Sequence, residues 1–443
     1  MENSLQLSRS GCRQHPHCAA LVRAGLLVTA LMAFASGVFA VGGPSAVETF
    51  QTLQQTLAAD EKRADWAVFL KDAERQKIFL NGSPTSGLEV ARALLQLHRP
   101  DEALVETRRF VAMGQTHAIL DSPLFQPVRK DIDAQLRKNR VSVVRAATVM
   151  EISDAGLLPE DIDYDPRSKR FFVTSILEHS IVALDASGNR QVFADSPDHW
   201  PMVALKVDGK RRRLWATEVA EDGFSAVPAA DWGRSVLLEY ELDRGTLLSR
   251  HEGSAHANLG DMVLADNGEP VVSDGTGGGI YRLQGGELRR IDHGEFISPQ
   301  TVAICRGSRH AFVPDYVRGI AEFDLETGAV RWLSTKDHHA LDGIDGLYCH
   351  GNALIAVQNG SSPERVVSFT LDRQKSEIRA ETLIERATST LGDPTHGVFI
   401  GDAFYYIANA GWSAIDEHGV ETSSRHLTPA LVMKADVAHP ILR

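Results

Sequence analysis

Six positions in the C-terminal two thirds of the chain share a regular spacing and a mostly polar character. Successive positions lie roughly 40 to 60 residues apart, and five of the six carry an oxygen or nitrogen donor. They are Glu160, Val203, Asp261, Gln300, Asp345 and His396. Carboxylate and amide oxygens that meet at one point suit a hard cation such as Ca²⁺ or Mg²⁺, and they also suit the hydroxyl groups of a small polar ligand. The chemistry therefore depends on whether the fold brings these positions together.

A second set of polar residues follows the first, each at the end of the next apolar run. The set is Ser175, Glu218, Asp274, Asp315, Asn359 and Asn409. All of these except Ser175 are candidate substrate-binding residues. Asp and Asn are also common at strand ends for a local reason, because their side chains accept hydrogen bonds from the N–H groups of turns. Turn capping therefore remains the alternative for each member of this set.

The two sets are joined by a repeated phrase, of which residues 345–359 give the clearest copy. There the sequence reads Asp-Gly-Leu-Tyr-Cys-His-Gly-Asn-Ala-Leu-Ile-Ala-Val-Gln-Asn, which is typical of a strand, a tight turn and a second strand. Most copies are followed by a second hairpin, so each repeat of about 40–50 residues holds four short strands. The residues alternate with a period of two, which excludes a solenoid of helices. The six copies predict a mainly β fold, a six-bladed β-propeller.

In a propeller, the first strand of each blade lies innermost, against the central channel. Its first residue then lies at one mouth of the channel, and the second strand brings its last residue back to the same mouth. We call the first set of polar positions the opening ring and the second set the closing ring. A strand over residues 143–152 is predicted to complete the sixth blade, so that the propeller spans residues 143–440. Carboxylates around a narrow channel repel one another unless a cation, a proton or a ligand offsets their charge.

On these residues the chain resembles the family of six-bladed propellers that contains gluconolactonase, senescence marker protein and luciferin-regenerating enzyme. The resemblance covers roughly residues 145–415 and is carried by the blade phrases, especially Ile344-Asp-Gly-Leu and Leu158-Pro-Glu-Asp-Ile. Enzymes of this family hold one divalent metal at the channel mouth and hydrolyse sugar lactones or related esters there.

The resemblance implies a role for each matching residue. Glu160 and Asp345 would be metal ligands, and Gln300 would be a third ligand in the place where the family has Asn. The metal would be Ca²⁺, with Mg²⁺ or Zn²⁺ as alternatives. Asp261 or His396 would act as the catalytic base, and the substrate would be a small polar molecule such as a sugar lactone. Two other functions stay open: a non-catalytic propeller that binds a ligand or a protein through a degenerate metal site, and a scaffold without a small-molecule site.

The first 40 residues have the pattern of a bacterial-type export signal. Three arginines precede a short apolar run, which ends in Val38-Phe-Ala, a sequence that resembles a cleavage site. The pattern predicts a periplasmic or secreted protein. Anchoring to the membrane by an uncleaved N-terminal segment is the alternative.

Residues 41–140 show helical periodicity and few turn signals. The stretch around Arg99-Pro-Asp-Glu resembles a tetratricopeptide-type helix–turn–helix. The segment is expected either to be a structural cap on the propeller or to offer a docking surface for a protein partner. The predicted helices cover residues 47–58, 64–76, 87–97, 100–113 and 122–138.

Charge and cysteine content limit the remaining functions. The formal net charge is −12 and no basic stripe is visible, which argues against nucleic acid as a partner. It also argues against anionic membrane surfaces, so no membrane contact is expected after signal cleavage. Cys305 and Cys349 lie in neighbouring blades at a spacing expected to exceed the roughly 7 Å limit between Cα atoms, so we expect no bridge. Trp412 is a candidate for stacking on a sugar ring, with blade packing as the alternative.

Overall fold

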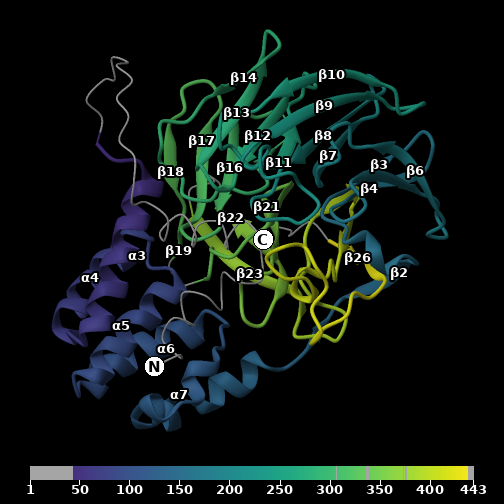
Figure 1. The fold of residues 1–443 in the computed structure, drawn as a ribbon. Helices are drawn as coiled ribbons and strands as arrows, with labels where there is room; N and C mark the ends of the chain where they lie inside the picture. Colours follow the sequence, from purple (N-terminus) through teal and green to yellow (C-terminus); the bar gives the residue numbers. More distant parts are fainter. Residues whose placement is uncertain (1–42, 306, 336–338, 373, 375–376, 438–443) are drawn as a thin grey trace.

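The computed structural model describes residues 43–305, 307–335, 339–372, 374 and 377–437. The predicted export signal over residues 1–40 lies outside the described residues. Figure 1 shows a ring of antiparallel sheets with a helical segment against one side. The fold is a six-bladed β-propeller preceded by a small all-α segment, as the repeat predicts.

The first four blades are four-stranded sheets whose strands follow one another in the chain. The first blade contains β3 (Ile162–Asp165), β4 (Arg170–Ser175), β5 (Ser180–Leu184) and β6 (Arg190–Asp195). The second contains β7 (Met202–Asp208), β8 (Arg213–Val219), β9 (Ser235–Glu241) and β10 (Leu247–Glu252). The third contains β11 (Leu259–Leu264), β12 (Pro270–Asp274), β13 (Gly279–Gln284) and β14 (Glu287–Arg290). The fourth contains β15 (Ala303–Ile304), β16 (His310–Asp315), β17 (Gly319–Asp324) and β18 (Val330–Trp332).

The fifth blade is enlarged by two short strands. Its main strands are β20 (Gly346–His350), β21 (Ala353–Gln358), β22 (Arg365–Leu371) and β23 (Glu377–Arg386). β19 (Ser334–Thr335) and β1 (Val143–Val144) both pair with β23. The tight turn between β20 and β21 contains Gly351, whose φ of 62° lies in the left-handed region that glycine adopts most easily.

The sixth blade closes the ring with a strand from the start of the propeller. It contains β24 (Gly397–Ile400), β25 (Ala403–Ile407) and β26 (Ala430–Asp436), and β2 (Ala146–Ile152) pairs with β26 as its outermost strand. The predicted closure is therefore confirmed for residues 146–152. Residues 143–144 instead join the fifth blade, because the chain crosses from one blade to the next at Arg145, whose N–H donates to the Ile384 carbonyl oxygen at 3.0 Å.

Hydroxyl groups of the second strands hold the neighbouring first strands in place. The Thr174 Oγ1 in β4 donates to the Val203 carbonyl oxygen in the next blade at 2.9 Å. The Ser273 Oγ in β12 donates to the Gln300 carbonyl oxygen at 3.0 Å. Both acceptors belong to opening-ring residues, so these buried bonds fix the main chain of the channel mouth from blade to blade.

The helical segment contains five helices among the described residues, close to the predicted spans. They are α3 (Ala46–Arg63), α4 (Trp66–Phe79), α5 (Pro84–Gln96), α6 (Pro100–Ala112) and α7 (Gln126–Asn139). Ser45 caps α3 in a capping box with Glu48, and proline occupies the first position of α5 and α6. The last helix begins later than expected, because η1 (Ala118–Asp121) and η2 (Pro123–Phe125) form short 3₁₀ turns before it. No helix in the described part of the chain is long and apolar enough to cross a membrane.

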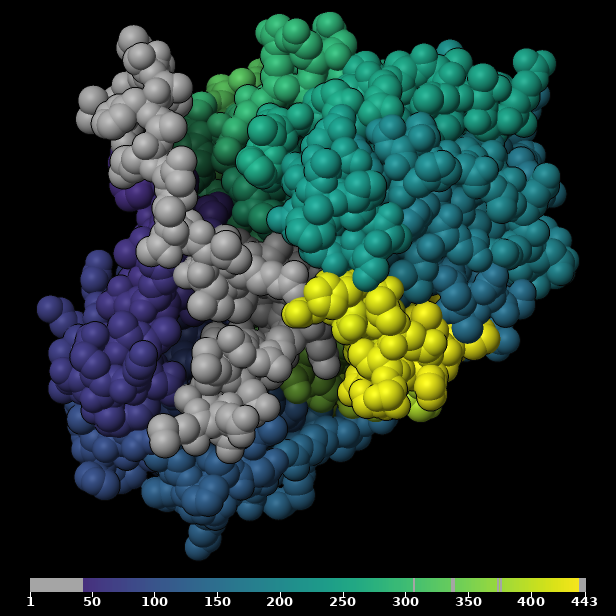
Figure 2. All heavy atoms as spheres, in the orientation of Figure 1, coloured from purple at the N-terminus to yellow at the C-terminus, as the bar shows by residue number. Residues whose placement is uncertain are grey.

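The helical segment packs on the face of the propeller that carries the channel mouth. Loops that enter a first strand and loops that leave a second strand emerge on the same face, because neighbouring strands are antiparallel. Three such loops receive the helical segment: the Ala46 N–H donates to the Gly294 carbonyl oxygen at 2.9 Å, the Asn81 Nδ2 reaches Arg318 and the Thr116 N–H reaches Ser362. Figure 2 shows the segment, purple to blue, beside the body of the propeller.

Cys305 and Cys349 form a disulfide, so the expectation of unpaired cysteines is wrong. Their Cα atoms lie 5.2 Å apart, within the range that a disulfide spans. Cys349 lies in β20 and Cys305 directly follows β15, the first strands of neighbouring blades. The two cysteines are close because first strands come closest together at the channel, at a smaller radius than the expected blade spacing.

Candidate metal centre

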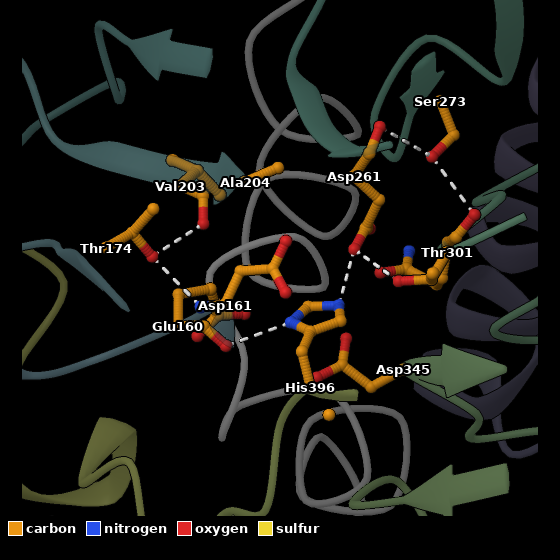
Figure 3. Close-up of polar contacts among 12 residues, drawn as sticks. Glu160, Asp161, Thr174, Val203, Ala204, Asp261, Ser273, Thr301, Asp345 and His396 are labelled. Atoms are coloured by element: carbon orange, nitrogen blue, oxygen red, sulfur yellow. Dashed lines mark hydrogen bonds and ion pairs between the residues drawn. The ribbon is translucent and has the colours of Figure 1, made fainter. Parts of the chain in front are cut away.

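Three members of the opening ring meet at one buried point. Carboxylate oxygens of Glu160 and Asp345 and a ring nitrogen of His396 all lie within 4.8 Å of one another. Each residue precedes the first strand of its blade: Glu160 lies two residues before β3, Asp345 directly before β20 and His396 directly before β24. Figure 3 shows the three side chains pointing toward a common centre. The repeat alignment, which placed them at one mouth, is therefore borne out by their positions.

Asp261 joins the centre through His396. The Asp261 Oδ1 lies 2.5 Å from the His396 Nε2, and the same oxygen accepts a hydrogen bond from the Thr301 hydroxyl at 2.7 Å. On the other side of the ring, the His396 Nδ1 lies 2.9 Å from the Glu160 carbonyl oxygen. A carbonyl oxygen only accepts, so Nδ1 carries a proton. The pairing of β11 with β12 has a register shift between Leu259 and Asp261, next to the residue that contacts His396.

Glu160 is held by one residue from the opposite end of the propeller sequence. The Trp412 indole N–H donates to the Glu160 Oε2. The other carboxylate oxygen, Oε1, is buried and accepts no hydrogen bond from the described residues. Burial raises the pKa of Glu160 well above its usual value, and the nearby Asp345 carboxylate raises it further. A cation at this point would compensate both effects.

Asp345 is oriented by a member of the closing ring. The Asn359 Nδ2 donates to the Asp345 Oδ2 at 2.9 Å and to the Pro394 carbonyl oxygen at 3.0 Å. The Asn359 Oδ1 in turn accepts from the Tyr316 hydroxyl at 2.9 Å. Asn359 therefore acts on the centre by fixing the position of a carboxylate.

The centre contains more acidic than basic side chains. Burial alone would lower the pKa of His396, but the carboxylates of Asp261 and Asp345 outweigh it and raise that pKa well above its usual value. A protonated imidazole balances one of the Asp261 and Asp345 carboxylates, and the raised pKa of Glu160 favours its neutral form in the absence of a cation. Carboxylate oxygens with a neighbouring imidazole are donors that divalent cations accept, so the residues present fit a metal ion.

Two opening-ring residues do not reach the centre by the described contacts. Val203 is buried and apolar. The Gln300 Nε2 donates to the Ser298 carbonyl oxygen at 3.2 Å and to the Ser298 hydroxyl at 3.0 Å. The amide of Gln300 is therefore tied to its own loop, and neither the contacts nor the geometry assigns it to the metal.

Two aspartates of the closing ring are turn caps. Both oxygens of Asp315 accept main-chain N–H groups, at 2.6 Å from Ile297 and at 3.2 Å from Val317, among others. Asp274 accepts main-chain N–H groups from Asn258 at 3.0 Å and from its own turn. Burial raises the pKa of both carboxyls despite these bonds. These contacts match the turn-capping alternative.

The remaining closing-ring residues also bond locally. The Ser175 Oγ donates to the Leu157 carbonyl oxygen at 2.6 Å. The Glu218 Oε2 accepts from the Ser196 hydroxyl at 2.5 Å, and burial raises the Glu218 pKa to about 7. The Asn409 side chain bridges Pro429 and Leu431 within its own blade. Among the described contacts of the closing ring, the hydrogen bond from Asn359 is the one that reaches an opening-ring carboxylate.

Sequence reasoning missed two contacts of the centre. Trp412 was considered for stacking on a sugar, but its indole N–H binds Glu160, and a separation of 252 residues hides that pairing from any local pattern. Thr301 was not singled out, although it directly follows Gln300 in the segment that leads into β15. A polar side chain next to an opening-ring position is the signal that could have identified it.

The propeller is similar to several solved structures. The calcium-binding protein regucalcin from Agrobacterium tumefaciens shares 18% identity over 67% of this chain and 96% of its own, with a TM-score of 0.46. A gluconolactonase from Xanthomonas campestris shares 14% identity over 64% of this chain and 88% of its own, with a TM-score of 0.44. The PQQ-bound aldose sugar dehydrogenase from Streptomyces coelicolor shares 12% identity over 66% of this chain and 99% of its own, with a TM-score of 0.46.

No protein-family model and no curated protein sequence matches the chain. The similar structures thus include a regucalcin, a gluconolactonase and a sugar dehydrogenase, and the likeness concerns the fold alone. One fold carries several chemistries. Function has to be argued from the residues at the channel mouth.

Proposed function

We propose that this protein is a metal-dependent hydrolase of a lactone or a related ester, with the reaction at the channel mouth. The observation that supports the proposal is the meeting of Glu160, Asp345 and His396 within 4.8 Å, all of them buried. Structural residues of a propeller gain nothing from placing like charges together in this way. A bound divalent cation would offset the repulsion between these acidic side chains.

Glu160 and Asp345 are the proposed metal ligands. His396 Nε2 already lies 2.5 Å from Asp261, so the donors that remain around the point are carboxylate oxygens. Oxygen donors favour Ca²⁺, with Mg²⁺ next, whereas direct binding by the imidazole would favour Zn²⁺. When bound, the ion would polarise the ester carbonyl and lower the pKa of a water molecule.

Asp261 and His396 are the proposed proton acceptor, acting as a pair. Because Nδ1 of His396 donates to the Glu160 carbonyl oxygen, only Nε2 can exchange a proton with Asp261. Thr301 holds the same Asp261 oxygen in place. Because Asp261 and Asp345 raise the pKa of His396, Asp261 is the member of the pair that would take a proton from water, and the two residues titrate as one unit.

The surroundings of the mouth support a small polar substrate. The helical segment packs on one side of this face, and on the other side the loops over residues 220–234 and 408–429 meet, with the Ser225 N–H 2.9 Å from the His418 carbonyl oxygen. Chain on both sides of the mouth favours a small substrate such as a sugar lactone over a polymer. We further propose export to the periplasm or the medium, from the pattern of residues 1–40, and a protein partner for the outer face of the helices.

A non-catalytic binding propeller is the second candidate. The attachment of Gln300 to Ser298 favours it, because a centre that lacks this ligand holds its metal less completely. In that case the channel mouth would bind a metal or a polar ligand without catalysing a reaction. The two candidates differ in turnover and not in binding.

Lactone hydrolysis by the purified, calcium-loaded protein tests the first candidate. With glucono-δ-lactone followed in a pH-stat, the proposal predicts acid release above the spontaneous rate, abolished by a chelator and by Glu160→Gln. Asp274→Asn, which alters a turn cap, is the matched control and should retain the rate. Metal binding without any turnover on a panel of lactones and esters would leave the binding propeller as the function.

A further inference from the structure

A cavity of about 310 Å³ opens beside the candidate metal centre. It lies between the loop that enters the sixth blade and the long loop over residues 408–429 that leaves its second strand. None of the residues placed at the centre lines it. Its volume is at the lower end of the range of small-molecule pockets, roughly 300–1,000 Å³.

Small residues make room in this pocket, and charged residues flank the space. Gly392, Gly411 and Ser413 line the wall, together with other short side chains. A Cβ on Gly411 would approach Leu427 Cδ2 to 3.0 Å, so a larger residue there would push against the loop. The long side chain in the lining is Arg425, which is exposed.

The charged groups differ in their partners. Among the described residues, no ion pair within 4.0 Å joins the Arg425 guanidinium to a carboxylate, but Arg425 is near enough to offset part of the charge of Asp393 and Glu364. His426 lies next to it and bonds Glu421 through Nδ1 at 2.9 Å, which leaves Nε2 on the other side of the ring. Asp393 is buried, and its Oδ2 accepts the Ser413 N–H at 2.7 Å. The pocket therefore offers cationic groups at its exposed side and a fixed carboxylate deeper inside.

Trp412 connects the pocket to the metal centre. Its two chain neighbours, Gly411 and Ser413, line the pocket, while its indole N–H bonds the Glu160 carboxylate. Asp393 lies three residues before His396 on the loop that enters β24. The pocket and the centre are thus neighbouring spaces that share a wall.

We propose that this pocket binds a small hydroxycarboxylate, with the ligand carboxylate on Arg425 and His426 and a ligand hydroxyl on Asp393. Guanidinium groups bind carboxylates through paired hydrogen bonds, and a buried carboxylate is an acceptor for hydroxyl groups. The proposal stands on the pocket alone and does not require turnover at the metal centre. If the proposed lactone hydrolysis holds as well, the ligand class is that of the ring-opened product.

Calorimetric titration of the purified, chelator-treated protein with gluconate tests the proposal without any metal. Gluconate should bind, and Arg425→Gln should weaken binding by about tenfold or more, the value of a charge-assisted hydrogen bond. Asp393→Asn should weaken it by a smaller factor. Arg167→Gln removes an equal charge from an exposed turn on the opposite face and should leave the affinity unchanged.

Glucose and acetate define the ligand class in the same titration. Glucose lacks the carboxylate and acetate lacks the hydroxyl groups, so each should bind at least about tenfold more weakly than gluconate. Absence of gluconate binding, equal binding by acetate, or unchanged affinity in Arg425→Gln would each overturn the proposal. Because no metal is present, these results do not depend on whether the centre hydrolyses lactones.

Discussion

The opening and closing rings carry similar residue types at the same mouth, yet they do different things. Opening-ring side chains such as Glu160 and Asp345 leave their own strands and meet across the channel. Closing-ring side chains such as Asp274 and Asp315 turn back onto N–H groups of nearby loops. A carboxylate is therefore a candidate metal ligand in the opening ring and a turn cap in the closing ring.

The difference follows from where each ring lies in the blade. A closing-ring residue ends the second strand and stands beside a turn, whose unpaired N–H groups are within reach of a short side chain. An opening-ring residue begins the innermost strand, where the nearest groups belong to other blades. Polar character alone therefore does not identify a site, and position relative to the channel does.

The disulfide gives the largest expected effect on stability. It joins two first strands at the end away from the mouth, so its removal should not affect the metal centre. Replacing Cys305 and Cys349 by serine opens a loop with a sequence separation of 44. Chain entropy predicts a loss of up to about 4 kcal/mol in the free energy of unfolding. Urea denaturation measures that loss, and a titration of the folded protein should show an unchanged affinity for metal. A large drop in metal affinity would show that the two ends are not separate.

Removing a turn cap should destabilise the fold without touching the centre. Asp315→Ala leaves buried N–H groups of Ile297 and Ser298 without their acceptor. The expected cost is about 3 kcal/mol in the free energy of unfolding, measured in urea at neutral pH. If stability stayed the same and metal affinity fell, Asp315 would belong with the opening ring.

Glu218, a closing-ring residue, should make the free energy of unfolding depend on pH. Burial raises its pKa in the folded protein to about 7, above the unfolded value of about 4.3. The stability that its neutral form contributes is therefore present below that unfolded value and is lost as pH rises toward 7. Relative to wild type, Glu218→Gln should gain on the order of 2 kcal/mol between pH 5 and pH 8. Unfolding curves at both pH values check this, and a constant difference would contradict it.

Asn359 and Asn409 provide a matched pair within the closing ring. Asn359 donates to the Asp345 carboxylate, whereas Asn409 bonds only within its own blade among the contacts described. Removing a residue that orients a metal ligand typically lowers affinity by about tenfold or more. Asn359→Ala should show that loss in a calcium titration and Asn409→Ala should not. Equal effects would remove the distinction between the two asparagines.

The sequence was sufficient for the architecture and for the convergence of four opening-ring residues, but it could not tell that Val203 and Gln300 stay away from the centre. Both follow from one repeat, because each copy places the same position at the same radius. The repeat could not separate Asn359 from Asn409, since the copies are alike and only the neighbouring blade differs. The repeat also could not predict that Trp412 lies beside Glu160. Their hydrogen bond joins the last blade to the first. The disulfide was missed because the distance between first strands depends on the channel radius, which residue spacing does not give.

Metal content is the most direct test of the central claim that the opening ring is a cation site. Elemental mass spectrometry of the purified protein would be compared with the double variant Glu160→Gln, Asp345→Asn. The account predicts about one divalent ion per wild-type chain, with Ca²⁺ favoured, and its loss in the variant. A wild-type protein that stays free of metal after soaking, or a variant that keeps the ion, would contradict it.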